Sequence, residues 1–431
     1  MSSFEQVYVL WYNCACMELK TVRDAGSLRG KNVLLRVAYD VPLQKRGSGY
    51  VVSDSRRIVQ TLPTIEYLLK AGAKVTLLTW LNRPQGKVVE KYRLDPIARS
   101  LSKLVKKPVK KINDCIGPVA AHAVSGLKNG SLLLLENVRF HRAEEVNDRH
   151  FARLLVHGQD LIVFDAFAQA HRVHASTVGI TKLLPTYAGM LLTKELAALD
   201  AVRTRPKQPL VIIIGGAKIS DKIATLEHLL PTAEAVLIGG GVANVFLKAS
   251  GVAVGQSFIE DVFVDSARRR KQNVVRLAKR LLKRWGKKII IPQDLIAANS
   301  IDQHAVTELI DLTIGDRIDK RWKFLDIGPR TVATFLSHIK SAKTIFWNGP
   351  MGVFEINLFS FGTKKIASAV ARSQAVSVIG GGDTEVVATA YGLENAFTHV
   401  STGGGASLEY LAAGKLPALE HILVKRSEKK R

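Results

Sequence analysis

The chain has 431 residues, of which 47% are hydrophobic and 23% charged, which excludes wholesale disorder and allows two or three domains with buried cores. Its longest apolar stretches are interrupted by glycine and fall short of the roughly 18–20 residues of a membrane span, so we expect a soluble protein. Lys and Arg total 62 against 37 Asp and Glu, and the net charge of +25 attracts nucleic acid, acidic membrane surfaces or phosphorylated metabolites without choosing among them. A basic proteome or a solvated basic face explains this charge equally well.

The N-terminal segment 1–16 precedes Met17, where a more ordinary protein start begins. It is largely apolar but has no basic segment before it, so it is a poor signal peptide, and we interpret it as an extension or a misplaced start. Cys14 and Cys16 have no second pair and no nearby His, so we expect no metal there. With Cys115 the count is three, which argues against a disulfide framework and predicts a reducing, cytoplasmic compartment.

Apolar runs of strand length alternate with helix-like stretches along most of the chain, which predicts βαβ units. Near-continuous runs of Val, Ile and Leu are typical of strands buried on both faces. We therefore predict an α/β fold of two lobes, each a parallel-sheet, Rossmann-like three-layer sandwich, joined by a helix and a hinge. The expected strands are 33–37, 74–79, 131–135 and 161–164, followed by 210–214, 235–238, 288–291, 344–347 and 375–379.

We place the N-terminal lobe at 17–188 and the C-terminal lobe at 189–402. The stretch 190–202 is helix-compatible and is followed by a proline-marked loop, as expected for a connection between lobes. Two basic stretches, 103–111 and 268–288, have helical character without interleaved aromatic residues. A solvated helix face is therefore favoured over a nucleic-acid site in both.

Arginines follow the strands of the first half. The guanidinium fork suits phosphate and carboxylate oxygens, so arginines from several loops are expected to converge on one small anion. His171 and His174 have no carboxylate or Cys at ligand spacing, so we interpret them as structural rather than as a metal pair. The four arginines are Arg57, Arg83, Arg139 and Arg172.

Glycine-rich turns follow the strands of the second half. Ligands of open parallel sheets bind at the carboxyl ends of the strands, where glycine allows close approach and helix N-termini offer N–H groups to phosphate. Five such turns predict a nucleotide or phosphate site, although the chain has neither a P-loop motif nor a dinucleotide fingerprint. The turns lie within 214–218, 238–241, 347–352, 379–384 and 401–407.

Four charged residues belong to or follow these turns. Lys218 and Lys222 are four apart, so we expect them on one face at the start of a helix, where they suit a polyphosphate. Asp383 either caps the next helix or holds Mg²⁺ against phosphates, and the neighbouring glycines favour the second role. Glu355 either accepts from ribose hydroxyls or is a surface charge.

A nucleotide lobe and a lobe for a small anion are the layout of a metabolite kinase. Phosphoryl transfer needs alignment and positive charge on the transferring oxygens rather than covalent help. Lys222 and Arg57 are the candidates for that charge, and we class both as catalytic.

The motifs resemble those of the phosphoglycerate kinase family from about Met17 to about Leu416. Matches at 347–355, 380–384 and 401–409 are as specific as the three motifs quoted next. The most specific are Leu135-Glu136-Asn137-Val138-Arg139-Phe140-His141, Ala170-His171-Arg172-Val173-His174-Ala175-Ser176-Thr177 and Gly215-Gly216-Ala217-Lys218-Ile219-Ser220-Asp221-Lys222.

This resemblance implies ATP + 3-phosphoglycerate ⇌ ADP + 1,3-bisphosphoglycerate with Mg²⁺, lobes that close by hinge motion, and a segment 403–431 that returns to the first lobe. We also expect a monomer. The predicted phosphoglycerate residues are Asp40, Arg57, Arg83, Arg139 and Arg172. The predicted nucleotide residues are Gly216, Ala217, Lys218, Lys222, Gly240, Asn348, Pro350, Glu355, Gly381, Gly382, Asp383 and Thr384. Asp383 is the predicted metal ligand, and Gly403, Gly404 and Gly405 are the predicted helix N-terminus that stabilises the transition state.

The departures from the family pattern lie in the first lobe. The family has Arg-Val-Asp-x-Asn-Val-Pro, and this chain has Ala38 and Asp40 in place of the Asp and the Asn. If the strand continues, positions 38 and 40 share a face, and Asp40 partly replaces the lost carboxylate. Trp80 replaces a His, and a third motif differs at Phe164, Ala168 and Gln169. Each lost polar contact to the triose is expected to cost about 1–3 kcal/mol.

The first hypothesis from the sequence is therefore a phosphoglycerate kinase that is active but has a reduced rate of turnover. The alternatives are an impaired relative that acts as a basic structural, RNA-binding or protein-binding subunit, and a kinase for a different small acid whose pocket Trp80 reshapes.

Overall fold

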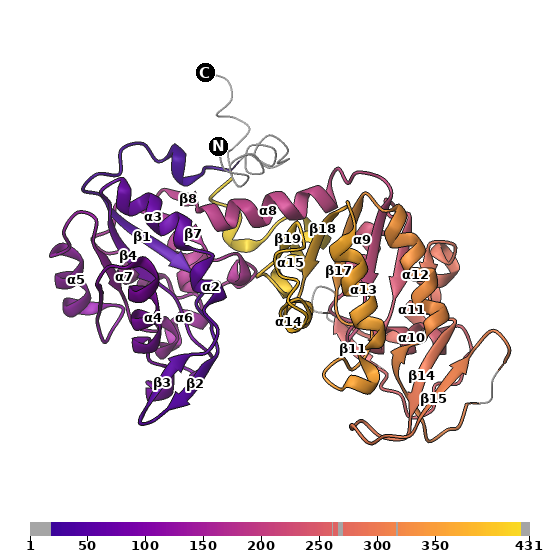
Figure 1. Cartoon of the computed structure of the whole chain (residues 1–431). Helices are drawn as coiled ribbons and strands as arrows, with labels where there is room; N and C mark the ends of the chain where they lie inside the picture. The colour runs from indigo at the N-terminus through magenta and orange to yellow at the C-terminus, as the bar shows by residue number, and fades with distance from the viewer. Residues whose placement is uncertain (1–18, 261, 266–269, 316–317, 424–431) are drawn as a thin grey trace. The chain divides into compact units, whose positions relative to one another are not determined.

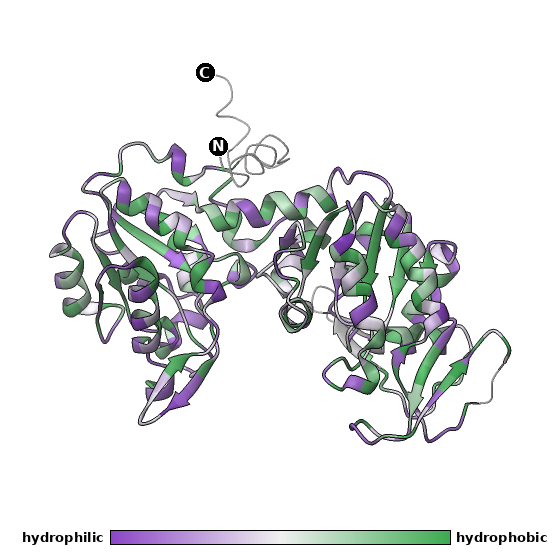
Figure 2. Cartoon of the chain, in the orientation of Figure 1, coloured by the Kyte–Doolittle hydropathy of each residue, from purple (hydrophilic) through white to green (hydrophobic). Residues whose placement is uncertain are grey.

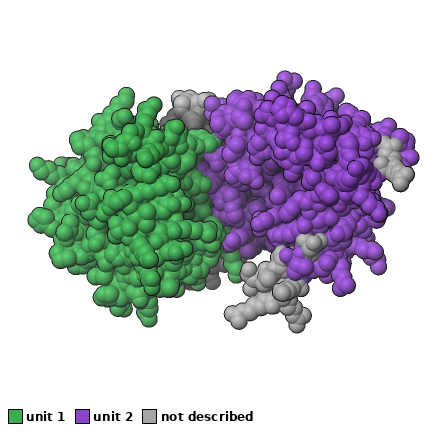
Figure 3. Space-filling view, turned by 90° about the horizontal axis from the view of Figure 1, so that it is seen from below, with its two compact units in different colours: residues 1–197, 415–431 green, residues 198–414 purple. Residues whose placement is uncertain are grey.

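The computed structural model describes residues 19–260, 262–265, 270–315 and 318–423. The segment 1–16, with Cys14 and Cys16, lies outside them. The chain divides into two compact units, coloured in Figure 3. Unit 1 contains the described residues up to Ala197 and from Lys415 onward, and unit 2 is Ala198–Gly414. The division falls within helix α8 (Met190–Arg203), which matches the helix expected at 190–202.

Unit 1 is built on a six-stranded sheet in which every neighbouring pair is parallel (Figure 1). All four strands expected in the first half are present, and β5 and β8 complete the sheet at its edges. The strand order is β5 (Val109–Lys111), β6 (Leu132–Leu134), β4 (Lys74–Leu78), β1 (Asn32–Val37), β7 (Leu161–Asp165) and β8 (Thr186–Ala188).

Two apolar cores lie on opposite faces of this sheet because side chains alternate along each strand. Val33, Leu35 and Val37 of β1 belong to one core, and Leu34 belongs to the other. Figure 2 shows the strands as largely green ribbons, as expected for elements buried on both faces. Arg36 is the exception, since it is a fully buried cation on a core strand.

Helices and one hairpin surround this sheet. The hairpin pairs β2 (Leu43–Arg46) with β3 (Gly49–Val52). The helices are α2 (Arg56–Val59), α3 (Leu62–Lys70), α4 (Asp95–Val105), α5 (Gly117–Ser125), α6 (Arg142–Glu145) and α7 (Arg149–Leu155), with short turns η1 (Val22–Asp24), η2 (Glu90–Tyr92), η3 (Val138–Phe140), η4 (Phe167–Gln169), η5 (Ala175–Gly179) and η7 (Pro417–Leu419).

Unit 2 contains a second six-stranded parallel sheet, so the predicted fold class of two parallel α/β sheets is confirmed. Its strand order is β13 (Ile289–Ile290), β10 (Ala235–Ile238), β9 (Leu210–Ile214), β17 (Thr344–Asn348), β18 (Val376–Gly380) and β19 (His399–Val400). Its helices are α9 (Ile223–Leu229), α10 (Gly240–Ala249), α11 (Val274–Trp285), α12 (Pro329–Ser341), α13 (Phe361–Arg372), α14 (Gly382–Ala390) and α15 (Gly405–Ala413), with the turn η6 (Asn357–Phe359).

Unit 2 also has antiparallel strands that the sequence did not predict. β14 (Asp294–Ala298) pairs with β15 (Thr307–Asp311) and β16 (Lys323–Ile327). β11 (Val262–Asp265) pairs with β12 (Arg270–Asn273). β15 is mostly exposed and polar, so it lacks the apolar run on which the strand predictions relied.

The helices predicted in the two basic stretches are shorter in the structure than the sequence indicated. α4 ends at Val105, where Lys106 turns to the left-handed φ of 53°, and Pro108 disfavours helical backbone at Lys107. The remainder forms β5. In the second stretch the helix begins only at Val274, where the side chain of Asn273 caps it by accepting from Arg276 N–H (2.9 Å).

The end of the described chain packs within unit 1. Ala418 N–H donates to the Ala170 carbonyl (3.1 Å), and Lys20 N–H donates to the Ile422 carbonyl (2.9 Å). This segment begins at Lys415, later than the start expected at 403, because α15 belongs to unit 2. No helix in the described part of the chain is long and apolar enough to cross a membrane.

Asp165 at the end of β7 is fully buried. Its carboxyl group accepts hydrogen bonds from Thr64 Oγ1 (2.6 Å) and Leu192 N–H (2.8 Å). Burial raises the pKa of Asp165 to about 7, from an ordinary value of 3.8. The folded chain therefore binds this proton more tightly than the unfolded chain does.

The free energy of unfolding is expected to fall as the pH rises from about 4 to about 7, because the unfolded chain loses the Asp165 proton first. The contribution is fully present below about pH 4 and absent above about pH 7. Asp165→Asn should reduce the change in the free energy of unfolding between about pH 4 and pH 7 by about 1–4 kcal/mol relative to the wild type. Denaturant unfolding across this range measures the slope, and identical slopes for the two proteins would contradict the assignment.

Candidate active site

The turns at the carboxyl ends of the unit 2 strands require glycine. Gly349, after β17, has φ +91°, and a Cβ there would lie 2.4 Å from the carbonyl oxygen of Gly215. Gly240, at the start of α10, has φ +58°, and its Cβ would lie 2.7 Å from Gly216 N. A side chain at either position would force the turns apart, so glycine brings three strand ends together at the edge where parallel sheets bind ligands.

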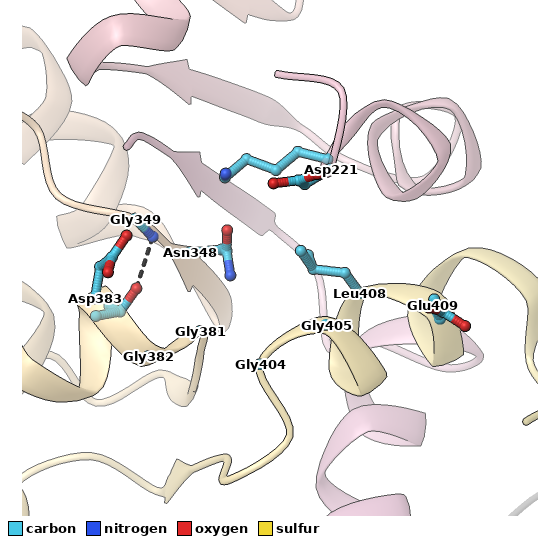
Figure 4. A pocket seen from close by; sticks show the side chains of 12 residues that line it. Asp221, Asn348, Gly349, Gly381, Gly382, Asp383, Gly404, Gly405, Leu408 and Glu409 are labelled. Carbon is cyan, nitrogen blue, oxygen red and sulfur yellow. Dashed lines mark hydrogen bonds between the residues drawn. The ribbon is translucent and has the colours of Figure 1, made fainter. Parts of the chain in front are cut away.

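A hollow of about 300 Å³ lies at this edge (Figure 4). Its walls come from the loop before α9, the ends of β17 and β18, and the first turns of α14 and α15. The N–H groups and positive dipole ends of two helices suit phosphate oxygens. The lining residues are Asp221, Lys222, Asn348, Gly349, Gly381, Gly382, Asp383, Thr384, Gly404, Gly405, Leu408 and Glu409.

Two of these residues hold the turns together. Thr384 Oγ1 accepts from Gly349 N–H (2.6 Å, the dashed line in Figure 4) and donates to the Gly380 carbonyl (3.0 Å). Asn348 Nδ2 donates to the same carbonyl (2.7 Å). Both side chains are buried, so they shape the hollow by tying β17 to β18.

Lys218 and Lys222 do not share a helix face, which corrects the expectation. α9 begins at Ile223, so Lys218 lies in the preceding loop. Lys218 is exposed, whereas Lys222 is 8% exposed and its Nζ donates to the Lys218 carbonyl (2.9 Å). Burial lowers the pKa of Lys222, and the carboxylates of Asp221, Asp383 and Glu260 oppose that shift.

Asp383 is not the cap of α14. The N-cap is Gly381, and no side chain makes a cap hydrogen bond there. The exposed carboxylate of Asp383 lines both this hollow and a second one beside it. A hard oxygen donor next to a phosphate-binding helix start fits Mg²⁺, which prefers one or two carboxylates together with substrate phosphates.

The second hollow, of about 530 Å³, is mainly apolar. Phe258 and Ile301 line it and are 55% and 53% exposed, so they offer apolar surface to a ligand. Leu325 and Val353 extend the same wall. The sequence analysis missed these residues because they stand outside every glycine turn. An apolar slot next to a phosphate-type hollow suits a nucleoside.

The structure places most predicted nucleotide residues on these two hollows. Gly216, Ala217, Gly240, Pro350, Glu355 and Asp383 line the larger one, and Lys222, Asn348, Gly381, Gly382, Asp383 and Thr384 line the smaller one. Gly404 and Gly405 line the smaller hollow at the start of α15, whereas Gly403 N–H donates to Ser401 Oγ (3.1 Å). Lys218 and Gly403, which the sequence also predicted, are not among the described residues that line either hollow.

Gly381→Ala should damage the smaller hollow, because Gly381 has φ +99° and a Cβ would lie 2.6 Å from Asn348 Nδ2. The strain alone is expected to cost about 1–3 kcal/mol. Gly382→Ala is the matched control, since its Cβ meets nothing within 4 Å. Thermal unfolding of both variants measures the strain, and equal losses of stability would contradict the geometry.

In unit 1, Asp40 and Asn82 connect the predicted arginines. Arg57 Nη1 donates to the Asp40 carbonyl (2.9 Å), and Asn82 N–H donates to Asp40 Oδ1 (2.9 Å). Arg139 Nη1 donates to the Asn82 carbonyl (2.7 Å). Asn82 has φ 59°, a left-handed conformation that Asn tolerates better than most residues. β1 ends at Val37, so the expected face-sharing of positions 38 and 40 does not apply.

The remaining predicted arginines lie within electrostatic reach of these groups. Burial lowers the pKa of Arg139, and the charge of Arg83 lowers it further. Burial also lowers the pKa of His174 to about 4, with contributions from Arg139 and Arg172. Arg83 and Arg172 are exposed and Arg57 is half-buried. Arg139 and Arg172 therefore lie near the His174 imidazole, Arg83 lies near Arg139, and Arg57 joins them through Asp40 and Asn82.

Two charged residues near this group escaped the sequence analysis. Arg36 is fully buried and donates from Nε to the Ser176 carbonyl (2.9 Å). Glu144 is equally buried and accepts from Ser176 N–H (2.9 Å) and Oγ (2.6 Å). Burial raises the pKa of Glu144. The only signal for Arg36 was its position within the apolar run 33–37, whereas Glu144 stands among other charged residues and gave no signal.

The comparisons with known proteins agree with this geometry. A family model described as "Phosphoglycerate kinase" matches residues 22–415. Proteins with that name from Dictyoglomus turgidum and Rubrobacter xylanophilus are each 45% identical, over 94% and 96% of this chain and 98% and 100% of their own. The structure of phosphoglycerate kinase from Coxiella burnetii has a TM-score of 0.80 and 36% identity, covering 94% of this chain and 98% of that one. A family model and relatives that span nearly the whole chain show that the chain belongs to the phosphoglycerate kinase family.

Proposed function

We propose that the chain catalyses reversible phosphoryl transfer between ATP and the carboxylate of 3-phosphoglycerate. The bond from the γ-phosphorus to the bridging oxygen of ADP breaks, and a bond from that phosphorus to a carboxylate oxygen forms. The observation that carries the proposal is the pair of adjoining hollows in unit 2. One is glycine-walled and carries Lys222 and Asp383, and the other is mainly apolar and suits a base and ribose.

In this proposal the hollows hold the two ends of the nucleotide. Lys222 and the N–H groups at the starts of α14 and α15 receive the phosphate oxygens. Phe258 and Leu325 contact the base, and Glu355 accepts from the ribose. Asp383 holds Mg²⁺, which when bound neutralises phosphate charge.

Unit 1 in this proposal holds the acid. Arg83, Arg139 and Arg172 bind its phosphate, and Arg57 stabilises the charge of the transferring group. Asp40 orients Arg57 and Asn82 through the hydrogen bonds described above. We propose that activity is reduced, because Ala38 offers no polar contact and Trp80 is 2% exposed and buried.

A coupled assay for ATP-dependent formation of 1,3-bisphosphoglycerate tests the proposal. We expect turnover that requires Mg²⁺ and saturates with both substrates. A panel of other small carboxylic acids should give lower kcat/KM values. A protein that binds ADP but shows no turnover with any acid would contradict the proposal. We further propose a cytosolic monomer, in keeping with the low cysteine count.

The charge of α11 favours a second candidate function, binding to an RNA backbone. No Asp or Glu occurs between Asp265 and Asp294. The apolar face of α11 packs into the core through Leu277 and Leu281, so it is not free to enter a membrane. Its exposed cations are Arg276, Lys279, Arg280, Lys283 and Arg284, and the exposed Lys287 follows its end.

Titration with single-stranded RNA over a range of salt concentrations tests this second function, because phosphate contacts weaken as salt rises. Arg280→Glu combined with Lys283→Glu should reduce the affinity at least tenfold. Lys103→Glu combined with Lys107→Glu, on the other basic stretch, is the matched control. Equal losses in both pairs, or no binding by the wild type, would leave α11 as a solvated face.

A further inference from the structure

A buried cluster of Trp80, Arg36, Arg139 and His174 lies at the anion site of unit 1; we call it the Trp80 cluster. The guanidinium carbons of Arg36 and Arg139 lie 4.4 Å and 4.1 Å from the centroid of the Trp80 ring. The His174 ring centroid lies 5.2 Å from the same ring. Both guanidinium distances are well inside the range of about 6 Å for cation–π attraction, and Trp is the strongest aromatic partner.

Each guanidinium group has a nitrogen that makes no hydrogen bond with a described residue. Arg36 donates from Nε to Ser176 and from Nη1 to the Val37 carbonyl, but its buried Nη2 has no hydrogen-bond partner among the described residues. Arg139 spends Nη1 on the Asn82 carbonyl, while its Nε has no hydrogen bond and lies 3.5 Å from Glu145 Oε1. Arg36 is fully buried, so of these two residues only Arg139, which is 6% exposed, can contact an anion directly, while the charge of Arg36 acts on the anion from within the fold.

The positive charge of the cluster is only partly balanced. Burial lowers the pKa of Arg36 to about 9; the charge of Arg139 lowers it further and that of Glu144 opposes the shift. Glu144 is the buried carboxylate here, and burial raises its pKa. The lowered pKa of His174 keeps its ring neutral near pH 7. An indole face attracts a cation without cancelling its charge, whereas a carboxylate does both.

The segments that carry Arg36 and Trp80 are neighbours in the sheet. β1 and β4 are parallel with Arg36 opposite Leu78, and Trp80 follows the end of β4 by two residues. Tyr39 N–H donates to Thr79 Oγ1 (3.0 Å), which holds the segment after β1 beside the segment after β4. Backbone pairing and this hydrogen bond therefore keep the ring close to the Arg36 guanidinium group.

We propose that Trp80 is a positioning residue of the anion site, whose ring holds the guanidinium groups of Arg36 and Arg139 in place while leaving their positive charge to the anionic substrate. The choice of substrate rests on the proposed function, but the role of the ring does not. Trp80 itself is buried and reaches the substrate only through Arg139.

Isothermal titration with 3-phosphoglycerate and, separately, with inorganic phosphate tests the proposal without requiring turnover. Trp80→Leu, which removes the ring face, should weaken binding of both anions at least tenfold. Trp80→Phe should restore affinity to within about threefold of the wild type, because Phe offers a weaker ring face in the same place. ADP affinity should be unchanged in both variants.

Phe151→Leu is the matched control for lost packing. Phe151 belongs to the same apolar cluster as Trp80 and stacks on His141, with ring centroids 5.1 Å apart. The Phe151→Leu variant should have a lower thermal stability but an unchanged affinity for the anions. Equal anion losses in Phe151→Leu and Trp80→Leu, or wild-type affinity in Trp80→Leu, would overturn the proposal.

Indole emission supplies a readout should Trp80→Leu fail to fold. Either anion should change the emission of the wild type, and Trp80→Phe should abolish that change; an undiminished change in Trp80→Phe would overturn the proposal. Wild-type binding of phosphate but not of 3-phosphoglycerate would defeat the proposed substrate alone. Binding of neither anion would defeat both.

Discussion

Arg57→Ala is expected to lower kcat for 1,3-bisphosphoglycerate formation about 10²–10³-fold, the usual loss when one preorganised donor to developing charge is removed. Arg57 lies on α2, and its Nη1 donates to the Asp40 carbonyl (2.9 Å), which orients the guanidinium group. Side-chain truncation leaves that carbonyl half-exposed to water, so the fold should tolerate the change. The coupled assay gives kcat, and titration gives the ADP affinity, which should not change.

Arg56→Ala is the matched control for this prediction. Arg56 is the adjacent residue, but its guanidinium group is paired with Asp54 through Nε hydrogen bonds of 3.0 and 2.9 Å. That pairing lowers the pKa of Asp54. We expect Arg56→Ala to change kcat less than threefold. A similar loss in both variants would show that α2 is sensitive to truncation in general and would remove Arg57 from the catalytic group.

The parallel strands and the family could be predicted from the sequence because both depend on local patterns. The apolar runs that end at Ile214 and Ile238 are confirmed as β9 and β10, and the resemblance to phosphoglycerate kinases is confirmed over residues 22–415. Exposed β15 and the helix end at Val105 were missed, because pairing partners and Pro108 decided them rather than periodicity.

Burial separated residues that looked alike in the sequence. Lys218 and Lys222 appeared equivalent, yet one is exposed and the other buried, because α9 starts after both. Trp80 stood out in the sequence only as a departure from the family pattern, and its ring is buried against two guanidinium groups. Arg36 drew no attention although it is fully buried. Such differences depend on contacts between distant segments, which no single stretch of sequence encodes.

Lys222→Met is expected to weaken ATP and ADP binding about 10–100-fold, since a charge-assisted hydrogen bond in a buried place is worth about 1.5–3 kcal/mol. Lys222 is 8% exposed and lines the smaller hollow with Asp383 and Gly381. Met keeps the length of the apolar stem and removes only the ammonium group. Nucleotide titration gives the affinity, and thermal unfolding checks the fold. Lys364→Met, an exposed position on α13 away from both hollows, is the control.

The pH dependence of ADP affinity distinguishes the effect of the Lys222 charge from the effect of its side-chain shape. Burial lowers its pKa below the ordinary 10.5, so its ammonium group loses its proton at a lower pH than an exposed lysine does. Wild-type ADP affinity should therefore fall as the pH rises toward that lowered value. The fall should be absent in Lys222→Met, which has no proton to lose, and in Lys222→Arg, which stays charged. If all three proteins lose affinity in parallel with rising pH, another group is responsible and Lys222 does not contact the phosphates through its charge.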